Sequence, residues 1–175
     1  MRALALITLI VACSVTAASQ QTRAQEIAAS FTKFKHETKE KYGFRKEKYK
    51  DVKSEPAVKQ NTRDYAGVYE VPDLGYVINI QVGSDGAVRA SGFEKAPQSR
   101  TFTLENARIE GALLTATKVY GDGATERFEG AFLSRTDRES PTDPGVTIFG
   151  LGVVLNTPTE INGITYERLF YQRRQ

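Results

Sequence analysis

Hydrophobic and polar residues alternate along the chain from about residue 64 to its end, and this alternation predicts β-strands. The clearest case is the segment 76–82. Tyr76, Ile78 and Ile80 fall on one face of the expected strand there, and Asn79 falls on the other. A strand of this kind buries one face and leaves the opposite face to water.

Turn signals divide this region into separate strands. Asp85-Gly86 and Asn162-Gly163 are pairs that tolerate positive φ, so each favours a tight hairpin. Together with the alternation they predict eight strands, at residues 67–71, 76–82, 87–93, 101–109, 112–120, 125–134, 146–155 and 164–173.

Eight strands that follow one another closely predict a mainly β fold, an antiparallel eight-stranded up-and-down β-barrel. A barrel is favoured because an open sheet leaves unpaired edges that invite aggregation. A two-sheet β-sandwich is the alternative, because the alternation of inward and outward residues is the same in both folds.

The segment before the strands has a different pattern. Ile27, Phe31 and Phe34 recur at helical spacing, and this spacing predicts one kinked helix or two short helices between residue 25 and about residue 52, because Gly43 weakens or breaks the helix in the middle. We therefore divide the chain into an export signal at 1–18, a basic helical arm and linker at 19–63, and a β-barrel domain at 64–175.

The first 18 residues predict export. Arg2 is followed by an apolar run at 3–12 and by small residues that end at Ala17-Ala18, the order found in secretory signals. The run is shorter than the roughly 20 apolar residues that span a bilayer. We expect a periplasmic or secreted protein, with a lipoprotein anchored through Cys13 as the alternative.

Charge separates the arm from the body. Residues 23–60 carry eleven basic and six acidic side chains, whereas the whole chain has a net charge of only +3. A lysine-rich arm is attracted to anionic surfaces, so an anionic envelope surface is a candidate partner of the basic helix. No nucleic-acid partner is expected of an exported protein, and the sequence carries no signal for the oligomeric state.

The order of several short motifs resembles the opening of calycin-type barrels, the group that contains lipocalins and avidins. These motifs are Gly67-Val68-Tyr69, Leu74-Gly75-Tyr76, Asp85-Gly86 and Gly92-Phe93. Lipocalins and avidins carry Gly-x-Trp on the first strand, and a basic residue of the last strand often packs across the Trp. The resemblance implies that Tyr69 replaces the Trp and that Arg168 is the basic partner.

The chain also departs from that group. It has no Trp, so the biotin site of avidins is not implied here. The Arg-x-Tyr with which fatty-acid-binding proteins hold a carboxylate is replaced by Arg168-Leu169-Phe170. The hydroxyl partner of that carboxylate site is therefore missing.

Catalytic and metal-binding chemistry has little material in this chain. His36 is the only histidine and Cys13 the only cysteine. Ser–His–acid triads, Cys–His pairs and zinc sites need more of these residues. We expect no catalytic residues, no metal and no cofactor.

A binding role is the first hypothesis for function. If the strands alternate regularly, eight side chains point into the barrel and form a ligand site: Tyr76, Ile78, Arg108, Phe128, Phe132, Tyr166, Arg168 and Phe170. Inside a barrel each arginine needs an internal acid such as Glu70 or Glu94, or an anionic ligand. The same alternation places Glu129 and Glu167 in solvent.

The sequence thus favours an exported, non-enzymatic barrel that binds a small, partly apolar or anionic ligand. An envelope-associated structural or interaction protein that works through its basic helix is the second hypothesis. A small barrel enzyme is the third.

Overall fold

The computed structural model describes residues 19–41, 44–95 and 99–175, and the side chains of all of these except 34–48. The expected export signal at 1–18 lies outside the described residues. A helix covers residues 19–31 and is followed by two short 3₁₀ turns and ten strands. The elements after the helix are β1 (Lys33–Lys41), β2 (Phe44–Pro56), η1 (Thr62–Tyr65), β3 (Gly67–Val71), η2 (Pro72–Leu74), β4 (Tyr76–Val82), β5 (Val88–Glu94), β6 (Arg100–Glu110), β7 (Leu113–Tyr120), β8 (Thr125–Arg138), β9 (Val146–Ile161) and β10 (Ile164–Arg173).

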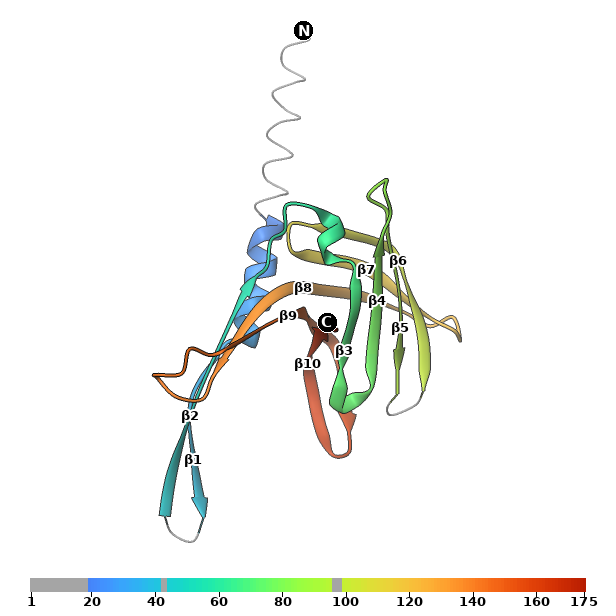
Figure 1. Ribbon diagram of the computed structural model, residues 1–175. Coiled ribbons are helices and arrows are strands. Elements are labelled where there is room, and N and C mark those ends of the chain that lie inside the picture. The colour runs from blue at the N-terminus through green and yellow to red at the C-terminus, as the bar shows by residue number, and fades with distance from the viewer. Residues whose placement is uncertain (1–18, 42–43, 96–98) are drawn as a thin grey trace.

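Strands β3 to β10 form a closed antiparallel barrel (Figure 1). Each strand pairs with the next in sequence, and the sheet closes where β10 pairs with β3, with Arg173 opposite Tyr69. The predicted eight-stranded up-and-down barrel is therefore confirmed. The sandwich alternative is wrong, since the hydrogen-bonded ring is continuous.

The expected helix from residue 25 to 52 is wrong beyond residue 31. Residues 33–56 instead form the hairpin of β1 and β2, which projects from the barrel (Figure 1). β7 pairs with β8 only as far as Ala131, and β2 continues the sheet by pairing with Leu133–Arg138. Backbone hydrogen bonds to this free edge outweigh the weak helix propensity of the segment.

The basic arm is consequently a hairpin rather than a helix. Arg23 and Glu26 are the only charged residues of the helix at 19–31, so the helix itself is neutral. Most of the lysines of the arm lie on β1 and β2. Within the described residues, the structure contains no helix that is long and apolar enough to cross a membrane.

The short helix packs against the outer face of β8 and β9. Ala24, Ile27 and Phe31 are buried at a spacing that places them on one side of the helix. The outward residues Ala131 and Leu133 lie beneath it and are fully buried. Where the helix covers them, both strands are thus buried on both faces. Their inner face lies in the barrel core, and their outer face lies under the helix.

Two glycines of β9 allow this close packing. A Cβ on Gly152 would lie 2.8 Å from a ring carbon of Phe31, and one on Gly150 would lie 2.7 Å from the ring of Phe170. The missing side chains at Gly150 and Gly152 thus let aromatic rings approach the backbone of β9.

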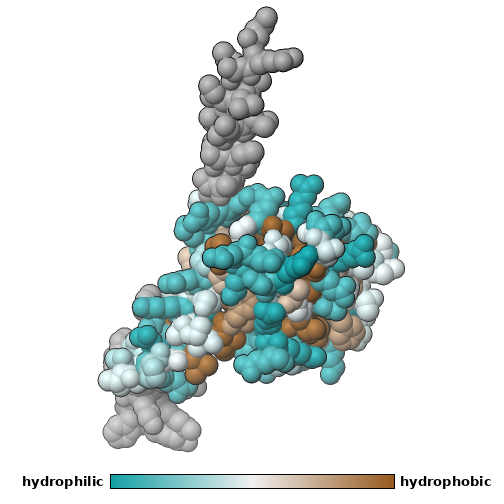
Figure 2. All heavy atoms as spheres, turned by 45° about the horizontal axis from the view of Figure 1, so that its top comes forward, coloured by the Kyte–Doolittle hydropathy of each residue, from teal (hydrophilic) through white to brown (hydrophobic). Residues whose placement is uncertain are grey.

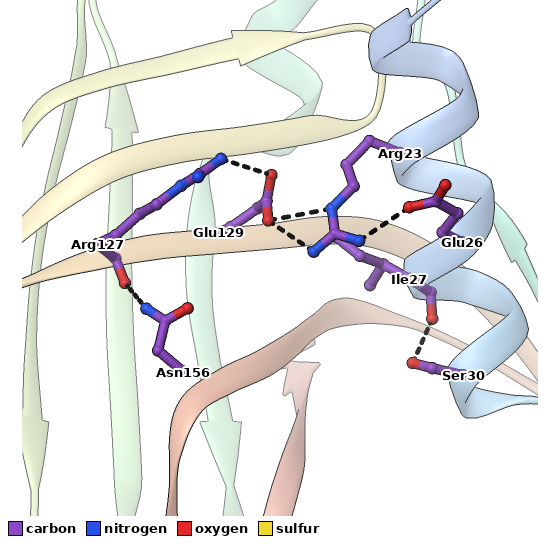
Figure 3. A network of polar contacts seen from close by, with 7 residues as sticks. All are labelled: Arg23, Glu26, Ile27, Ser30, Arg127, Glu129 and Asn156. Atoms are coloured by element: carbon purple, nitrogen blue, oxygen red, sulfur yellow. Dashed lines mark hydrogen bonds and ion pairs between the residues drawn. The ribbon is translucent and has the colours of Figure 1, made fainter.

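A polar clamp also joins the helix to the barrel (Figure 3). Arg23 donates to Glu129 on β8 through Nε at 3.1 Å and Nη2 at 2.9 Å, and its Nη1 donates to Glu26 at 2.8 Å. The expectation that Glu129 faces open solvent is wrong, because the helix leaves only 14% of its side chain exposed.

Aromatic rings fill the end of the barrel near η1. Tyr65 stacks on Phe132 with centroids 4.2 Å apart, and Phe132 lies parallel to Phe149 at 6.3 Å. The hydroxyl of Tyr69 donates to the carbonyl of Tyr65 at 2.6 Å. Arg173 closes this end by donating to the backbone carbonyls of Asp64 and Ala66.

Candidate binding site at the barrel mouth

Four of the predicted site residues lie inside the barrel as expected. Tyr76, Ile78, Phe128 and Phe132 are buried and belong to the inward phase of their strands. Ile78 and Phe132 are completely enclosed by neighbouring side chains. Tyr76 is the one of the four that lines the cavity at the open end, and ligand binding by these residues stays a prediction.

The expected inward orientation of Arg108 is wrong. The pairing of β6 with β7 shifts register between Glu105 and Arg108, where Asn106 adopts a positive φ of 53°. One extra residue reverses the alternation, so Ala107 and Ile109 pack against the core and Arg108 is exposed. No feature of the alternation itself marks this bulge.

The expected inward orientation of Arg168 and Phe170 is also wrong. Leu169 and Tyr171 of β10 are the buried residues that face the interior, opposite Val153 and Leu151. Phe170 packs outside against Phe31 of the helix, with ring centroids 6.0 Å apart. Both faces of β10 are apolar here, so alternation does not distinguish them.

Tyr166 likewise lies outside the barrel cavity. It lines an outer groove together with Arg168 and Phe170, next to the end of the helix. The basic residue of the last strand that lies beside Tyr69 is Arg173, five positions after the Arg168 that the sequence indicates.

A cavity of about 270 Å³ opens at the end of the barrel opposite the one that Tyr65, Phe132 and Phe149 fill. Its wall is formed where β5 and β7 end and where β6 and β8 begin, and residues 155–159 of β9 form the rim. The polar side chains in the wall are Glu94, Arg100, Lys118, Tyr120 and Glu126, and Tyr76 and Leu169 supply apolar surface.

Lys118 is the centre of this wall. Its side chain is only 5% exposed, and its Nζ pairs with Glu94 Oε1 and, at 3.0 Å, with Glu126 Oε1. The same Nζ lies 4.5 Å from the ring centroid of Phe102 and 4.7 Å from that of Tyr120. Two carboxylates and two aromatic rings therefore surround one buried ammonium group.

Tyr120 links the two carboxylates. Its hydroxyl donates to Glu126 Oε1 at 2.8 Å and lies 3.3 Å from Glu94 Oε2. Burial raises the pKa of Tyr120 well above its ordinary value, and the hydrogen bond to Glu126 and the charges of both glutamates raise it further. The phenol therefore stays protonated and remains a hydrogen-bond donor over the physiological pH range.

The other tyrosines near the cavity are also held in the neutral form. Burial and the negative charge of Glu94 raise the pKa of Tyr76 to about 12, against a smaller opposing effect of a hydrogen bond to Thr159. The pKa of Tyr171 lies well above its usual range, chiefly because the phenol is buried.

Arg100 forms the outer edge of the cavity. Its guanidinium carbon lies 3.6 Å from the centroid of the Tyr120 ring, and its Nη2 donates to Asp122 at 3.0 Å. The four charged residues of the wall, Glu94, Arg100, Lys118 and Glu126, are formally neutral together. Asp122, which is not part of the wall, pairs with Arg100 and leaves Lys118 facing both glutamates, so the total with Asp122 is one negative. Charge at the mouth thus favours a ligand with hydrogen-bond donors or a positive charge.

Sequence reasoning missed Lys118, although the sequence contains a signal for it. Lys118 shares the inward phase of β7 with Leu114, Ala116 and Tyr120, and a lysine on an apolar strand face requires an internal partner. Glu94 is the internal acid that the sequence suggests for an arginine, and it pairs with this lysine instead. In the part of the chain that is described, no group of three or more His, Cys, Asp or Glu residues is arranged to hold a metal ion.

Comparisons of this chain with protein families, with curated proteins and with solved structures find no match. The chemistry of the mouth is therefore interpreted from its own geometry.

Proposed function

We propose that the protein is an exported, non-enzymatic barrel that binds a small molecule in the cavity at its mouth. The observation that supports this proposal is the network of Lys118, Glu94, Glu126 and Tyr120 in the cavity wall. A buried ion pair contributes little net stability compared with apolar packing. The opposite end of the same barrel is filled by rings, so charges are not needed to close it.

The charges of the mouth favour a small amine as the ligand. Arg100 is paired with Asp122, so two glutamates face one lysine inside the cavity, and the phenol rings of Tyr76 and Tyr120 supply surfaces that attract cations. The volume, about 270 Å³, lies below the 300–1,000 Å³ of sites for drug-sized ligands. A partly apolar ligand agrees with the sequence-based prediction, whereas an anion is disfavoured at this position.

The resemblance to calycin-type barrels forms part of the proposal. The closed up-and-down barrel supports it, as does the position of Tyr69 on the first strand next to Arg173 of the last. Arg173, and not Arg168, is the basic residue of the last strand that lies opposite Tyr69, and its guanidinium lies 5.6 Å from the centroid of the Phe149 ring. Barrels of eight strands have room for one small ligand at most, which agrees with the size of the mouth.

A pair of probes that share a ring but differ in charge tests this proposal. Tyramine carries an ammonium group and 4-hydroxyphenylacetate a carboxylate, and each is titrated into the full chain while backbone amide shifts are recorded by NMR. We expect saturable binding of tyramine, with shifts concentrated around Tyr76, Lys118 and Glu126.

Two variants with the same change of charge locate the binding site. Glu126→Gln removes one negative charge from the mouth and should weaken tyramine binding roughly three- to tenfold. Glu110→Gln makes the same change on an exposed residue at the end of β6 that is far from the mouth, and it should leave binding unchanged. Tighter binding of the carboxylate probe, or no saturable binding of either probe, would overturn the proposal.

A further inference from the structure

A second hollow lies outside the barrel, on the surface where the hairpin arm leaves it. The end of the helix, β2 and the first half of β10 enclose a groove of about 450 Å³. Figure 2 shows apolar surface at the junction between the arm and the barrel, surrounded by hydrophilic residues. Among the described residues, Leu169 is the one that lines both this groove and the mouth cavity.

The floor of the groove is apolar. Phe31 and Phe170 contact each other there, and Val52 of β2 is almost completely buried beside them. The guanidinium of Arg135 lies over the Phe170 ring at 5.2 Å from its centroid, so the floor extends to the edge of β8. An apolar body of a ligand can therefore lie flat on these rings.

The rim of the groove is basic. Lys33 lies opposite Val52 in the hairpin, and Lys50 is two positions before Val52, so both lysines share the face that borders the groove. Arg168 approaches from β10 and donates to the carbonyl of Ser30 at the end of the helix, which fixes its guanidinium at the rim.

The charges of the rim leave an excess of positive charge. Arg135 is paired with Asp137 through two hydrogen bonds of 2.7 and 2.8 Å. Among the lining residues whose side chains the structure describes, Glu167 is the one acidic side chain, against Lys33, Lys50 and Arg168. An apolar floor with a basic rim is complementary to a molecule that carries an acidic head group on an apolar body.

We propose that this groove binds one molecule of a free amphiphilic anion, a carboxylate or phosphate on a short apolar chain. Its head group contacts Lys50, Lys33 and Arg168, and its chain lies on Phe31 and Phe170. The ligand class is opposite in charge to that of the mouth. The two sites are therefore independent, and the failure of one proposal does not affect the other.

Decanoate is a suitable probe, because it is a single-chain carboxylate that can be used as a monomer. It is titrated into the full chain by calorimetry and by NMR, with decylammonium and decanol as probes of opposite and of no charge. We expect saturable one-to-one binding of decanoate, weaker binding of decanol and none of decylammonium. The amide shifts should gather at residues 31–33, 50–52 and 165–170 and leave Lys118 and Glu126 unchanged.

Two variants on the same strand provide the matched test. Lys50→Gln removes a charge from the face that borders the groove and should weaken decanoate binding about tenfold. Lys53→Gln makes the same change at an exposed position of the opposite strand face and should leave binding unchanged. Both residues are exposed, so neither change should disturb folding.

Vesicles that contain an anionic lipid distinguish a bound molecule from a charged surface. Binding to such vesicles together with no saturable binding of monomeric decanoate would overturn the proposal, because the basic hairpin alone would then explain the attraction. Equal losses of affinity in Lys50→Gln and Lys53→Gln would overturn it in the same way.

Discussion

The contact between Gly152 and Phe31 allows a quantitative test of how the helix is attached to the barrel. A Cβ at position 152 would lie 2.5 Å from Cδ1 of Leu133 and 2.8 and 3.1 Å from two ring carbons of Phe31. Leu133 is fully buried and Phe31 nearly so, so neither side chain has free space into which it can move. The change Gly152→Ala therefore adds one carbon to a space that is already filled.

Overpacking of this kind costs about 1–3 kcal/mol. Because three distances fall below the range of ordinary contacts, we expect the free energy of unfolding to fall by about 2 kcal/mol. For a chain of this length that corresponds to a fall in Tm of roughly 4–8 °C. Urea unfolding of the full chain, followed by circular dichroism, measures the change in midpoint at constant slope.

Two further variants separate overpacking from a general effect of replacing glycine by alanine. In a Phe31→Ala background the ring is absent and its space lets Cδ1 of Leu133 move away, so Gly152→Ala should cost clearly less than in the unchanged chain. The two changes should be non-additive by about 1 kcal/mol or more, of the order seen for contacting residues. Gly121→Ala places its Cβ 3.8 Å from the nearest atom and should change stability by less than about 0.5 kcal/mol. The reasoning is refuted if Gly152→Ala costs the same with and without the Phe31 ring.

Three other predictions concern the barrel itself. Lys118→Met leaves Glu94 without its buried partner and should lower the free energy of unfolding, measured in urea, by about 3–5 kcal/mol. Adding Glu94→Gln should restore part of that loss. No change in the single variant would contradict the ion-pair geometry. Tyr69→Phe removes the 2.6 Å hydrogen bond to the carbonyl of Tyr65 and should cost about 1–2 kcal/mol in the same measurement. Burial raises the pKa of Tyr76 to about 12 from an ordinary value of 10.0, so the folded state holds this proton more tightly than the unfolded state does. The contribution of this proton to stability is thus complete below pH 10 and is lost as the pH rises towards 12. Urea unfolding measured at several pH values between 8 and 11.5 should therefore show a falling midpoint rather than a constant one.

Most strands of the barrel could be predicted because they have one clearly apolar face and a defined turn. The alternation in 76–82 and the Asp85-Gly86 turn place β4 and the start of β5 correctly, and the same kind of signal recurs as far as β10. A regular pattern and a local turn are sufficient where a strand is buried on one side only.

The orientation of β10 could not be predicted in the same way. The helix buries the outer face of the sheet, so Phe170 on one side and Leu169 and Tyr171 on the other are all apolar. When both faces of a strand are covered, period-2 alternation gives two equivalent solutions. The inward and outward positions of β6 are exchanged at Asn106 for a separate reason. One extra residue with positive φ causes the bulge there, and the hydrophobic pattern does not mark that residue.

The hairpin of β1 and β2 was missed because its partner is distant in the sequence. Lysine-rich segments with scattered aromatic residues fit a helix and a strand almost equally well, and local spacing favours the helix. The decisive factor is the edge of β8 beyond Ala131, which pairs with residues 51–56. Local spacing within residues 33–56 carries no information about a strand so far along the chain.

The docking of the short helix connects these observations to the two proposed sites. The described residues that line the mouth all lie on β4 to β10 and none lies on the helix, so we expect its charges to be independent of the helix. The groove needs Phe31 and Ser30 of the helix and Val52 of the hairpin, and it exists only when both are held against β8 to β10. A change that loosens the helix, such as Gly152→Ala, should therefore weaken decanoate binding while tyramine binding is retained. Equal loss of both ligands would mean that the mouth also depends on the outer layer, which the contacts of Lys118, Glu94 and Glu126 argue against.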